Sequence, residues 1–220
     1  MRPGLPVNLF VGVARHLRRE PGIALAIVAT TALAVGAATA LFLYLSVFLF
    51  PHLDAPQPDR VGSVYLGEQS EPRPLASYAE FEQVRSARAF EGVAANSALG
   101  ATLTAGSASS FAWGQVVSGE FFSFFGGQAA QGRLLGPGDE ALGAPPVAVL
   151  SHRLWHGRFA SDPAVVGRSL LVNGEAVTVV GVVAPGFVGT GYASAFYLPL
   201  TLSDRVSGVA RLREPNEHWL

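Results

Sequence analysis

The strongest feature of the hydrophobic pattern is an uninterrupted apolar segment near the N-terminus. Residues 23–50 are 28 consecutive positions without a charged side chain. A helix needs about 20 apolar residues to cross a bilayer, and 28 residues at about 1.5 Å each would reach about 42 Å. The pattern predicts a transmembrane helix over residues 23–50 that tilts or extends beyond the hydrocarbon layer.

Two other interpretations of this segment stay open. A buried core helix would need a larger domain around it than the neighbouring residues provide. A signal peptide could be cleaved at the small residues Ala38-Thr39-Ala40, but its apolar part is usually only about 7–15 residues long. Such a cleavage would also leave the apolar residues 41–45 at the new N-terminus. An uncleaved membrane anchor is the favoured interpretation.

Charged residues are distributed unequally on the two sides of the apolar segment. Residues 1–22 contain four arginines and one glutamate, a balance of +3, whereas residues 51–220 contain 11 arginines and 15 acidic residues. The positive-inside rule therefore places residues 1–22 in the cytoplasm and residues 51–220 outside it. Residues 7–20 predict a short amphipathic helix at the inner membrane surface, because apolar residues recur at helical spacing with arginines on the other side. A disordered basic tail is the alternative.

Small residues repeat along one face of the predicted membrane helix. Ala32, Gly36 and Ala40 are spaced by four. Small residues at this spacing allow another helix to approach closely. We predict that they pack against a further membrane helix, although alanine is frequent enough in this chain for the repeat to arise by chance.

The remaining residues, 51–220, predict an α+β domain, because helical and strand patterns mix without strict alternation. We expect helices over residues 75–92 and 151–159 and a short aromatic helix over residues 120–126. We expect strands over residues 60–66, within 93–118, and over 146–150, 170–183 and 196–200, with a loop over 133–144.

Local signals within this domain are specific. Ser77 with Glu80 three residues later is typical of a helix capping box. Asn173-Gly174 between two apolar runs is typical of a tight hairpin turn in which both residues need positive φ. We expect Trp155 to anchor the helix over residues 151–159 in the core of the domain.

Composition narrows the possible functions. Only 14% of the 220 residues are charged, the net charge is -1, and the chain contains no cysteine. The lack of a basic excess argues against a nucleic-acid partner. Without cysteine there are no disulfides, iron–sulfur clusters or thiolate zinc sites. All 15 basic residues are arginine, so the phosphate-loop lysine of Walker ATPases is missing as well.

Candidate catalytic residues are few. His152 and His156 have the i, i+4 spacing of zinc-binding histidines, but Arg153 stands where a metalloprotease has glutamate, and no third ligand is evident. Ser151 lacks the Gly-x-Ser-x-Gly context of a hydrolase nucleophile and is better explained as a helix N-cap. We predict no catalytic residue, metal site or cofactor. The phenylalanine-rich residues 121–125 are interpreted as core, with a partner-binding surface as the alternative.

Three stretches carry a combined pattern that is more specific than any of its parts. Residues 19–42, REPGIALAIVATTALAVGAATALF, join arginine, Pro-Gly and a Leu-Ala-x-Gly pattern. Residues 116–135 place a Phe-Phe turn before a Gly-Arg loop, and residues 147–187 join Val-Leu-Ser, Leu-Trp, Asp-Pro-x-Val-x-Gly and Asn-Gly in one order. In this order they resemble the MacB-like periplasmic core domain of FtsX-like bacterial ABC transporter permeases, from about residue 8 to residue 220.

The resemblance implies a location, partners and a mechanism. The chain would supply the first span and the periplasmic domain of a permease in the bacterial inner (cell) membrane, with its N-terminus in the cytoplasm. The resemblance implies a homodimer, a cytoplasmic ABC ATPase on a separate or fused chain, and further periplasmic or outer-membrane components. The chain itself would not be an enzyme, and the overlong first helix would couple ATPase action to extracytoplasmic movement in export or efflux.

One departure from the family pattern matters. Family permeases usually have three further transmembrane helices after the outer domain, which is often longer than residues 51–220. We therefore expect this domain to be incomplete and the chain to be a truncated permease or a fragment. Two alternatives remain: a single-span, membrane-anchored extracytoplasmic binding or sensor domain, and an anchored hydrolase built on Ser151, His152 and His156.

Overall fold

The structure is a computed structural model that describes residues 21–49, 56–68, 71–73, 75–87, 89–190, 194–214 and 217–220. The chain divides into two compact units, residues 1–51 and 52–220, and each is described by itself. Of the predicted amphipathic segment 1–22, only the last two residues lie within the described part of the chain.

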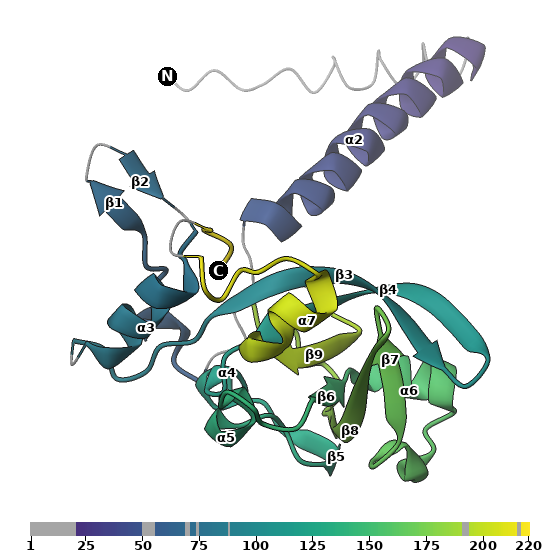
Figure 1. Cartoon of the computed structure of the whole chain (residues 1–220). Helices are drawn as coiled ribbons and strands as arrows, with labels where there is room; N and C mark the ends of the chain where they lie inside the picture. Colours follow the sequence, from purple (N-terminus) through teal and green to yellow (C-terminus); the bar gives the residue numbers. More distant parts are fainter. Residues whose placement is uncertain are drawn as a thin grey trace. The chain divides into compact units, whose positions relative to one another are not determined.

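The first unit contains one long helix, α2 (Pro21–Leu49), shown in Figure 1. The helix begins at Pro21, two residues before the apolar segment 23–50 that predicts the span. By length and composition, α2 is the one helix among the described residues that could cross a membrane, and its mean hydropathy reaches 2.1 within Pro21–Leu45. None of this stretch is buried inside the structure, so the structure does not support the alternative of a buried core helix.

The second unit combines short helices with strands and confirms the predicted α+β class. Its helices are α3 (Tyr78–Ser86), α4 (Phe121–Phe124), α5 (Pro137–Glu140), α6 (His152–Phe159) and α7 (Ser203–Ser207), with 3-10 turns η1 (Pro58–Arg60), η2 (Pro163–Val165) and η3 (Leu200–Leu202). Its strands are β1 (Leu66–Glu68), β2 (Glu71–Arg73), β3 (Asn96–Ala105), β4 (Ala108–Val117), β5 (Ala129–Gly132), β6 (Val147–Leu150), β7 (Ser169–Val172), β8 (Glu175–Val183) and β9 (Phe196–Pro199).

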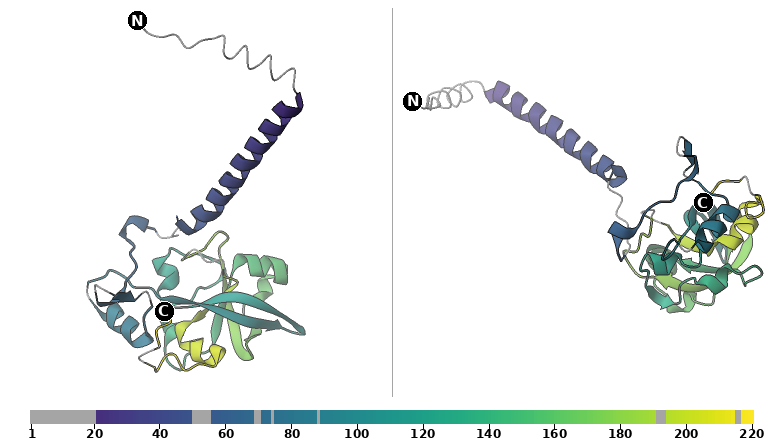
Figure 2. Two further views of the ribbon diagram at one scale, coloured as in Figure 1. Left: turned by 90° about the horizontal axis from the view of Figure 1, so that it is seen from above. Right: turned by 90° about the vertical axis from the view of Figure 1, so that its left-hand side faces the viewer.

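Seven strands form one mixed sheet in the order β5-β8-β6-β9-β4-β3-β7. Because β7 also pairs with β8, the strands β8, β6, β9, β4, β3 and β7 form a closed circuit of pairings. The pairings of β4 with β9 and of β6 with β8 are parallel. The long β3–β4 hairpin extends toward α6 (Figures 1 and 2), where Arg158 donates to the Ser110 hydroxyl at 2.6 Å and to the Ala108 carbonyl at 2.7 Å.

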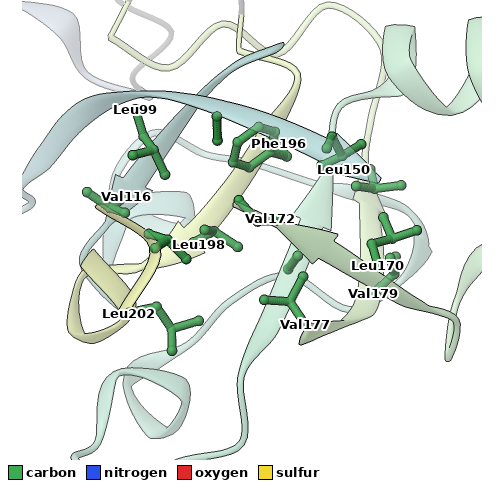
Figure 3. Close-up of a cluster of buried hydrophobic side chains, with 14 of the residues drawn as sticks. Leu99, Val116, Leu150, Leu170, Val172, Val177, Val179, Phe196, Leu198 and Leu202 are labelled. Atoms are coloured by element: carbon green, nitrogen blue, oxygen red, sulfur yellow. The ribbon is translucent and has the colours of Figure 1, made fainter. Parts of the chain in front are cut away.

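The larger of two apolar clusters lies within this circuit, and every strand of the circuit contributes to it (Figure 3). Strand alternation explains the two clusters, because successive side chains point to opposite faces of a sheet. In β6, Ala148 and Leu150 belong to the larger cluster, whereas Val147 and Val149 belong to the second. All four residues are buried, which accounts for the continuous apolar run that predicts this strand.

The second cluster confirms the core interpretation of the phenylalanine-rich residues. Phe121, Phe122 and Phe125 are buried and pack with Tyr197 of β9. The Phe122 and Tyr197 rings meet edge to face with their centroids 5.1 Å apart, a favourable geometry for aromatic pairs. Helix α4 therefore covers one face of the sheet.

The predicted capping signals are observed at two helices. At α3, the Ser77 backbone N–H donates to Glu80 Oε2 at 2.9 Å, and the Glu80 N–H donates to Ser77 Oγ at 3.3 Å. At α6, Ser151 Oγ accepts from the Leu154 N–H at 3.2 Å. Each contact satisfies a backbone donor that the first helical turn leaves without an internal partner.

Three of the predicted segments differ from the structure. Residues 61–65 form no strand, and β1 begins at Leu66 and pairs with β2 in a separate two-stranded sheet. Val64 and Tyr65 are exposed, so the apolar side chains that suggested a half-buried strand here do not pack on the core. Helix α3 ends at Ser86 instead of Gly92, because Ala87 turns to extended backbone. The expected loop over residues 133–144 contains the short helix α5.

Candidate functional site

Helix α2 satisfies the hydrogen-bonding groups of its threonines internally. Thr31 Oγ1 donates to the Ile27 carbonyl and Thr39 Oγ1 to the Val35 carbonyl, each at 2.8 Å. Thr30 bonds in the same way to Ala26 at 2.9 Å. Hydroxyls bonded to the preceding turn can enter an apolar environment at low cost. The helix therefore suits a membrane despite these polar side chains.

The three small residues of α2 lie in its exposed surface. Ala32, Gly36 and Ala40 are all exposed. A Cβ added at Gly36 would meet no atom within 4 Å. Contacts within the chain therefore give no steric reason for glycine at position 36. Close packing of a second membrane helix against Gly36 stays a prediction.

The structure places Asn173 and Gly174 in the turn between β7 and β8, with φ of 50° and 89°. Asn173 has a second role that its turn propensity does not reveal. Its Oδ1 accepts from the Thr102 N–H at 2.8 Å, and its Nδ2 donates to the Val206 carbonyl at 2.9 Å. Asn173 thus links the hairpin to β3 and to α7.

The structure places Trp155 in the larger apolar cluster, with 7% of its surface exposed. Its Nε1–H donates to the Asp162 carbonyl at 2.9 Å. A buried tryptophan usually needs such a partner for its only polar group. Trp155 therefore holds α6 to the segment that follows it.

The residues considered for hydrolysis do not form a catalytic arrangement. The Ser151 hydroxyl caps α6. His156 Nδ1 lies 2.9 Å from Ser161 Oγ, and its ring stacks on that of His152 at a centroid distance of 6.4 Å. Within the described ranges, no group of three or more His, Cys, Asp or Glu side chains could hold a metal ion.

The structure brings together acidic residues that are scattered in the sequence. Arg85 of α3 forms ion pairs with Glu82 at 2.5 Å, with Glu140 at 3.0 Å and with Glu120 at 3.6 Å. These carboxylates come from α3, from the start of α4 and from α5. The three carboxylates and one guanidinium leave an excess of two negative charges when all are ionised. We refer to these four residues as the Arg85 cluster.

Glu140 is the most buried member of the Arg85 cluster, with a side chain 5% exposed. Its Oε2 accepts from Arg85 at 3.0 Å and from the Gly119 N–H at 2.8 Å. Burial raises the pKa of this carboxyl, and the hydrogen bond from Gly119 opposes that shift. A Cβ at Gly119 would lie 2.5 Å from Pro137 Cα, so glycine is needed where this loop passes α5.

Comparison with protein families identifies the chain. Residues 23–217 match the MacB-like periplasmic core domain. The chain belongs to this family. The matched range begins inside α2 and continues through the second unit to residue 217, so the apolar helix and the α+β domain fall within one MacB-like match.

Two solved structures share the fold of this MacB-like chain. The extracellular domain of the noncanonic ABC-type transporter YknZ from Gram-positive bacteria aligns with a TM-score of 0.53 and 15% identity, over 66% of this chain and 75% of that one. The periplasmic region of MacB from Actinobacillus actinomycetemcomitans aligns with a TM-score of 0.53 and 19% identity, over 71% and 66%. No curated protein matches the sequence significantly.

An exposed aromatic pair distinguishes the surface of this MacB-like domain. Phe111 and Trp113 of β4 are 63% and 62% exposed, and their rings meet edge to face at 5.5 Å. They lie across Gly100 of β3, where a Cβ would approach Phe111 to 2.9 Å. Nothing in the local sequence marks these residues as exposed, because alternation predicts two faces of a strand without showing which face is covered.

Proposed function

We propose that the chain is the N-terminal part of an ABC transporter permease, consisting of its first membrane span and its periplasmic core domain. The observation that carries the proposal is the single family match over residues 23–217, which includes most of α2 together with nearly all of the second unit, residues 52–220. The proteins named in the two structural comparisons, an ABC-type transporter and MacB, point the same way.

We further propose that residues 1–22 are cytoplasmic, that residues 23–50 span the bacterial inner membrane and that residues 51–220 lie in the periplasm. The charge distribution supports this orientation, because residues 1–22 have a net charge of +3 and residues 51–220 a net charge of -4.

The proposed role is mechanical. Helix α2 has 29 residues, and at about 1.5 Å per residue it is about 44 Å long, whereas the hydrocarbon core is about 30 Å thick. An untilted helix would extend about two and a half turns beyond the hydrocarbon core, and we propose that this extension acts as a stalk. A cytoplasmic ABC ATPase would supply the free energy, and the stalk would pass its movement to the periplasmic domain in export or efflux. We propose a homodimer as the moving unit, with further periplasmic or outer-membrane components.

The absence of cysteine from the chain makes a clean test of orientation possible. Single cysteines would replace Ser107, an exposed residue in the β3–β4 turn, and Asn8 in the N-terminal segment. A membrane-impermeant maleimide applied to spheroplasts should label the variant at position 107 and leave the variant at position 8 unlabelled until lysis. Labelling at position 8 before lysis, or at position 107 only after lysis, would reverse the proposed topology.

A Gly-Gly insertion after Pro51 in the complete transporter tests coupling through the stalk. A fluorophore on the same Ser107→Cys site would report movement of the domain when ATP is added. The insertion should preserve ATP hydrolysis and abolish most of the ATP-dependent signal, because a flexible joint does not transmit force. An undiminished signal would contradict coupling through α2.

A single-span binding or sensor domain is the second candidate. It is favoured by the closed circuit of strands, which gives the second unit a hydrophobic core of its own. The two candidates differ in their dependence on an ABC ATPase. A permease part needs one, whereas a binding domain would function without it.

A further inference from the structure

One face of the large sheet is exposed and uncharged. Successive side chains of a strand point to opposite faces of a sheet, so the residues of β3, β4 and β7 that alternate with the larger apolar cluster point away from it. Cross-strand pairing connects these outward residues, because Thr104 lies opposite both Ser109 and Leu171. We refer to six of them, none of which is charged, as the aromatic face: Thr102, Thr104, Ser109, Phe111, Trp113 and Leu171.

Two rings supply most of the apolar surface of the aromatic face. Phe111 and Trp113 are 63% and 62% exposed, although both rings lean on Gly100, where a Cβ would lie 2.9 Å and 3.2 Å from them. Leu171 adds an aliphatic side chain that is 40% exposed. An aromatic side chain buries about 150–250 Å² when it is fully covered, so the exposed part of the pair offers roughly 250 Å².

This apolar area is small for an interface with a free protein. A specific protein–protein interface usually buries about 800 Å² on each partner. Two tethered surfaces need much less area, because a covalent link removes most of the loss of freedom that association costs. The second unit is tethered in this way, since residues 50–55 alone join its described part to α2. It therefore stays within reach of the bilayer that α2 would cross.

The composition of the aromatic face also suits lipid. Tryptophan, phenylalanine and leucine are the apolar residues typical of segments that lie in a membrane interface. The hydroxyls of Thr102 and Ser109 can donate to and accept from headgroups. Anionic lipids are recognised by lysine and arginine, and the aromatic face has neither. Its chemistry therefore matches a neutral lipid surface.

We propose that the aromatic face binds the surface of the bilayer that α2 crosses, with Phe111 and Trp113 inserted among neutral headgroups and the upper acyl chains. This inference rests on the proposed membrane span of α2. It gives the second unit a lipid contact of its own, in addition to its covalent link to the membrane helix.

Trp113 is a natural reporter for this contact. The chain has three tryptophans, none of them in α2, and Trp155 and Trp219 are 7% and 6% exposed in the larger apolar cluster. The full chain would be reconstituted into phosphatidylcholine vesicles, with and without bromine on the acyl chains close to the headgroups. Brominated lipid should remove most of the emission of one tryptophan in three, and Trp113→Phe should abolish this quenching. Iodide in the aqueous phase should quench Trp113 only weakly.

A charged substitution tests the face itself. Phe111→Asp places a carboxylate where the ring would insert and should reduce quenching by brominated lipid at least severalfold. Because Phe111 is exposed, this change should not disturb folding. Leu142→Asp is the matched control, since Leu142 is 86% exposed and lies outside the aromatic face. Its quenching by brominated lipid should equal that of the native chain.

Three results would overturn the proposal. Strong quenching by iodide without quenching by brominated lipid would leave Trp113 in water, and protection from both quenchers would assign the face to a partner protein or a second copy of the chain. Equal quenching of the Phe111→Asp and Leu142→Asp variants would also contradict it. Vesicle flotation tests the span separately. A chain that floats without lipid quenching keeps the proposed span and loses this contact, whereas a chain that does not float contradicts both.

Discussion

At the scale of single residues, Gln115 is the side chain whose chemistry fits its surroundings least. It is 1% exposed, and neither its Oε1 nor its Nε2 has a hydrogen-bond partner among the described residues. It lies on β4 and pairs in register with Tyr197 of β9. A buried amide without partners lowers the free energy of unfolding by roughly 1–3 kcal/mol.

Gln115→Met should therefore stabilise the domain by about 1–2 kcal/mol, because methionine has a similar shape and no polar group to desolvate. Urea unfolding followed by tryptophan fluorescence would measure the change. A variant less stable than the native chain would show that the amide has a partner in the folded protein.

Glu140 gives a pH prediction. Burial raises the pKa of this carboxyl above its ordinary value of 4.5, so the folded state binds the proton more tightly than the unfolded state. The contribution of Glu140 to stability is therefore full below about pH 4.5 and decreases as the pH rises through the folded-state pKa. Between pH 4 and pH 7, the native chain should lose stability relative to Glu140→Gln in urea unfolding. A relative gain would contradict the sign of the shift.

At the scale of elements, signals confined to a few residues could be read from the sequence. The capping box at Ser77 and the buried strand β6 depend on neighbours along the chain. The Arg85 cluster depends on contacts between residues distant in sequence, such as Arg85 and Glu140, which are 55 positions apart. No local pattern contains that information. Asn173 shows both cases, because its turn is local and its bonds to Thr102 and Val206 are not.

Asn173→Gly separates these two roles. Glycine adopts positive φ readily, so the turn should persist together with the bond from the residue 173 N–H to the Thr102 carbonyl. The side-chain bonds to the Thr102 N–H and the Val206 carbonyl are lost. We expect a loss of about 1–3 kcal/mol in the free energy of unfolding. Gly174→Ala is the complementary variant, since it keeps both bonds and strains the backbone. Native stability of Asn173→Gly would mean that the two bonds contribute nothing.

Gly36→Leu tests whether α2 packs against another membrane helix. Leucine has a better helix propensity than glycine and meets no obstacle within the chain, so the isolated helix should not suffer. The substitution should reduce assembly severalfold, measured as the fraction of dimer or ATPase complex recovered in mild detergent. Ala38→Leu, about 200° around the helix, is the matched control. Equal recovery of both variants would contradict packing through the small residues.

At the scale of the whole molecule, the sequence predicted an apolar helix followed by an α+β domain, because composition and periodicity persist over many residues. It did not predict the closed circuit of strands. The parallel pairing that joins β4 to β9 brings Gln115 beside Tyr197, and pairings across such separations follow from the packing of the whole core. Membership in the MacB-like family then connects this architecture with ABC transporter permeases.

The central claim, that this chain works within an ABC transporter, is tested most directly by purifying the protein that carries this sequence from native membranes in mild detergent. If the claim is right, the protein is recovered with an ABC ATPase, as a separate or fused chain in comparable amount, and the preparation hydrolyses ATP. A folded, membrane-extracted protein recovered without any such ATPase and without ATP hydrolysis would show that the chain does not work within an ABC transporter, and would favour the single-span binding domain.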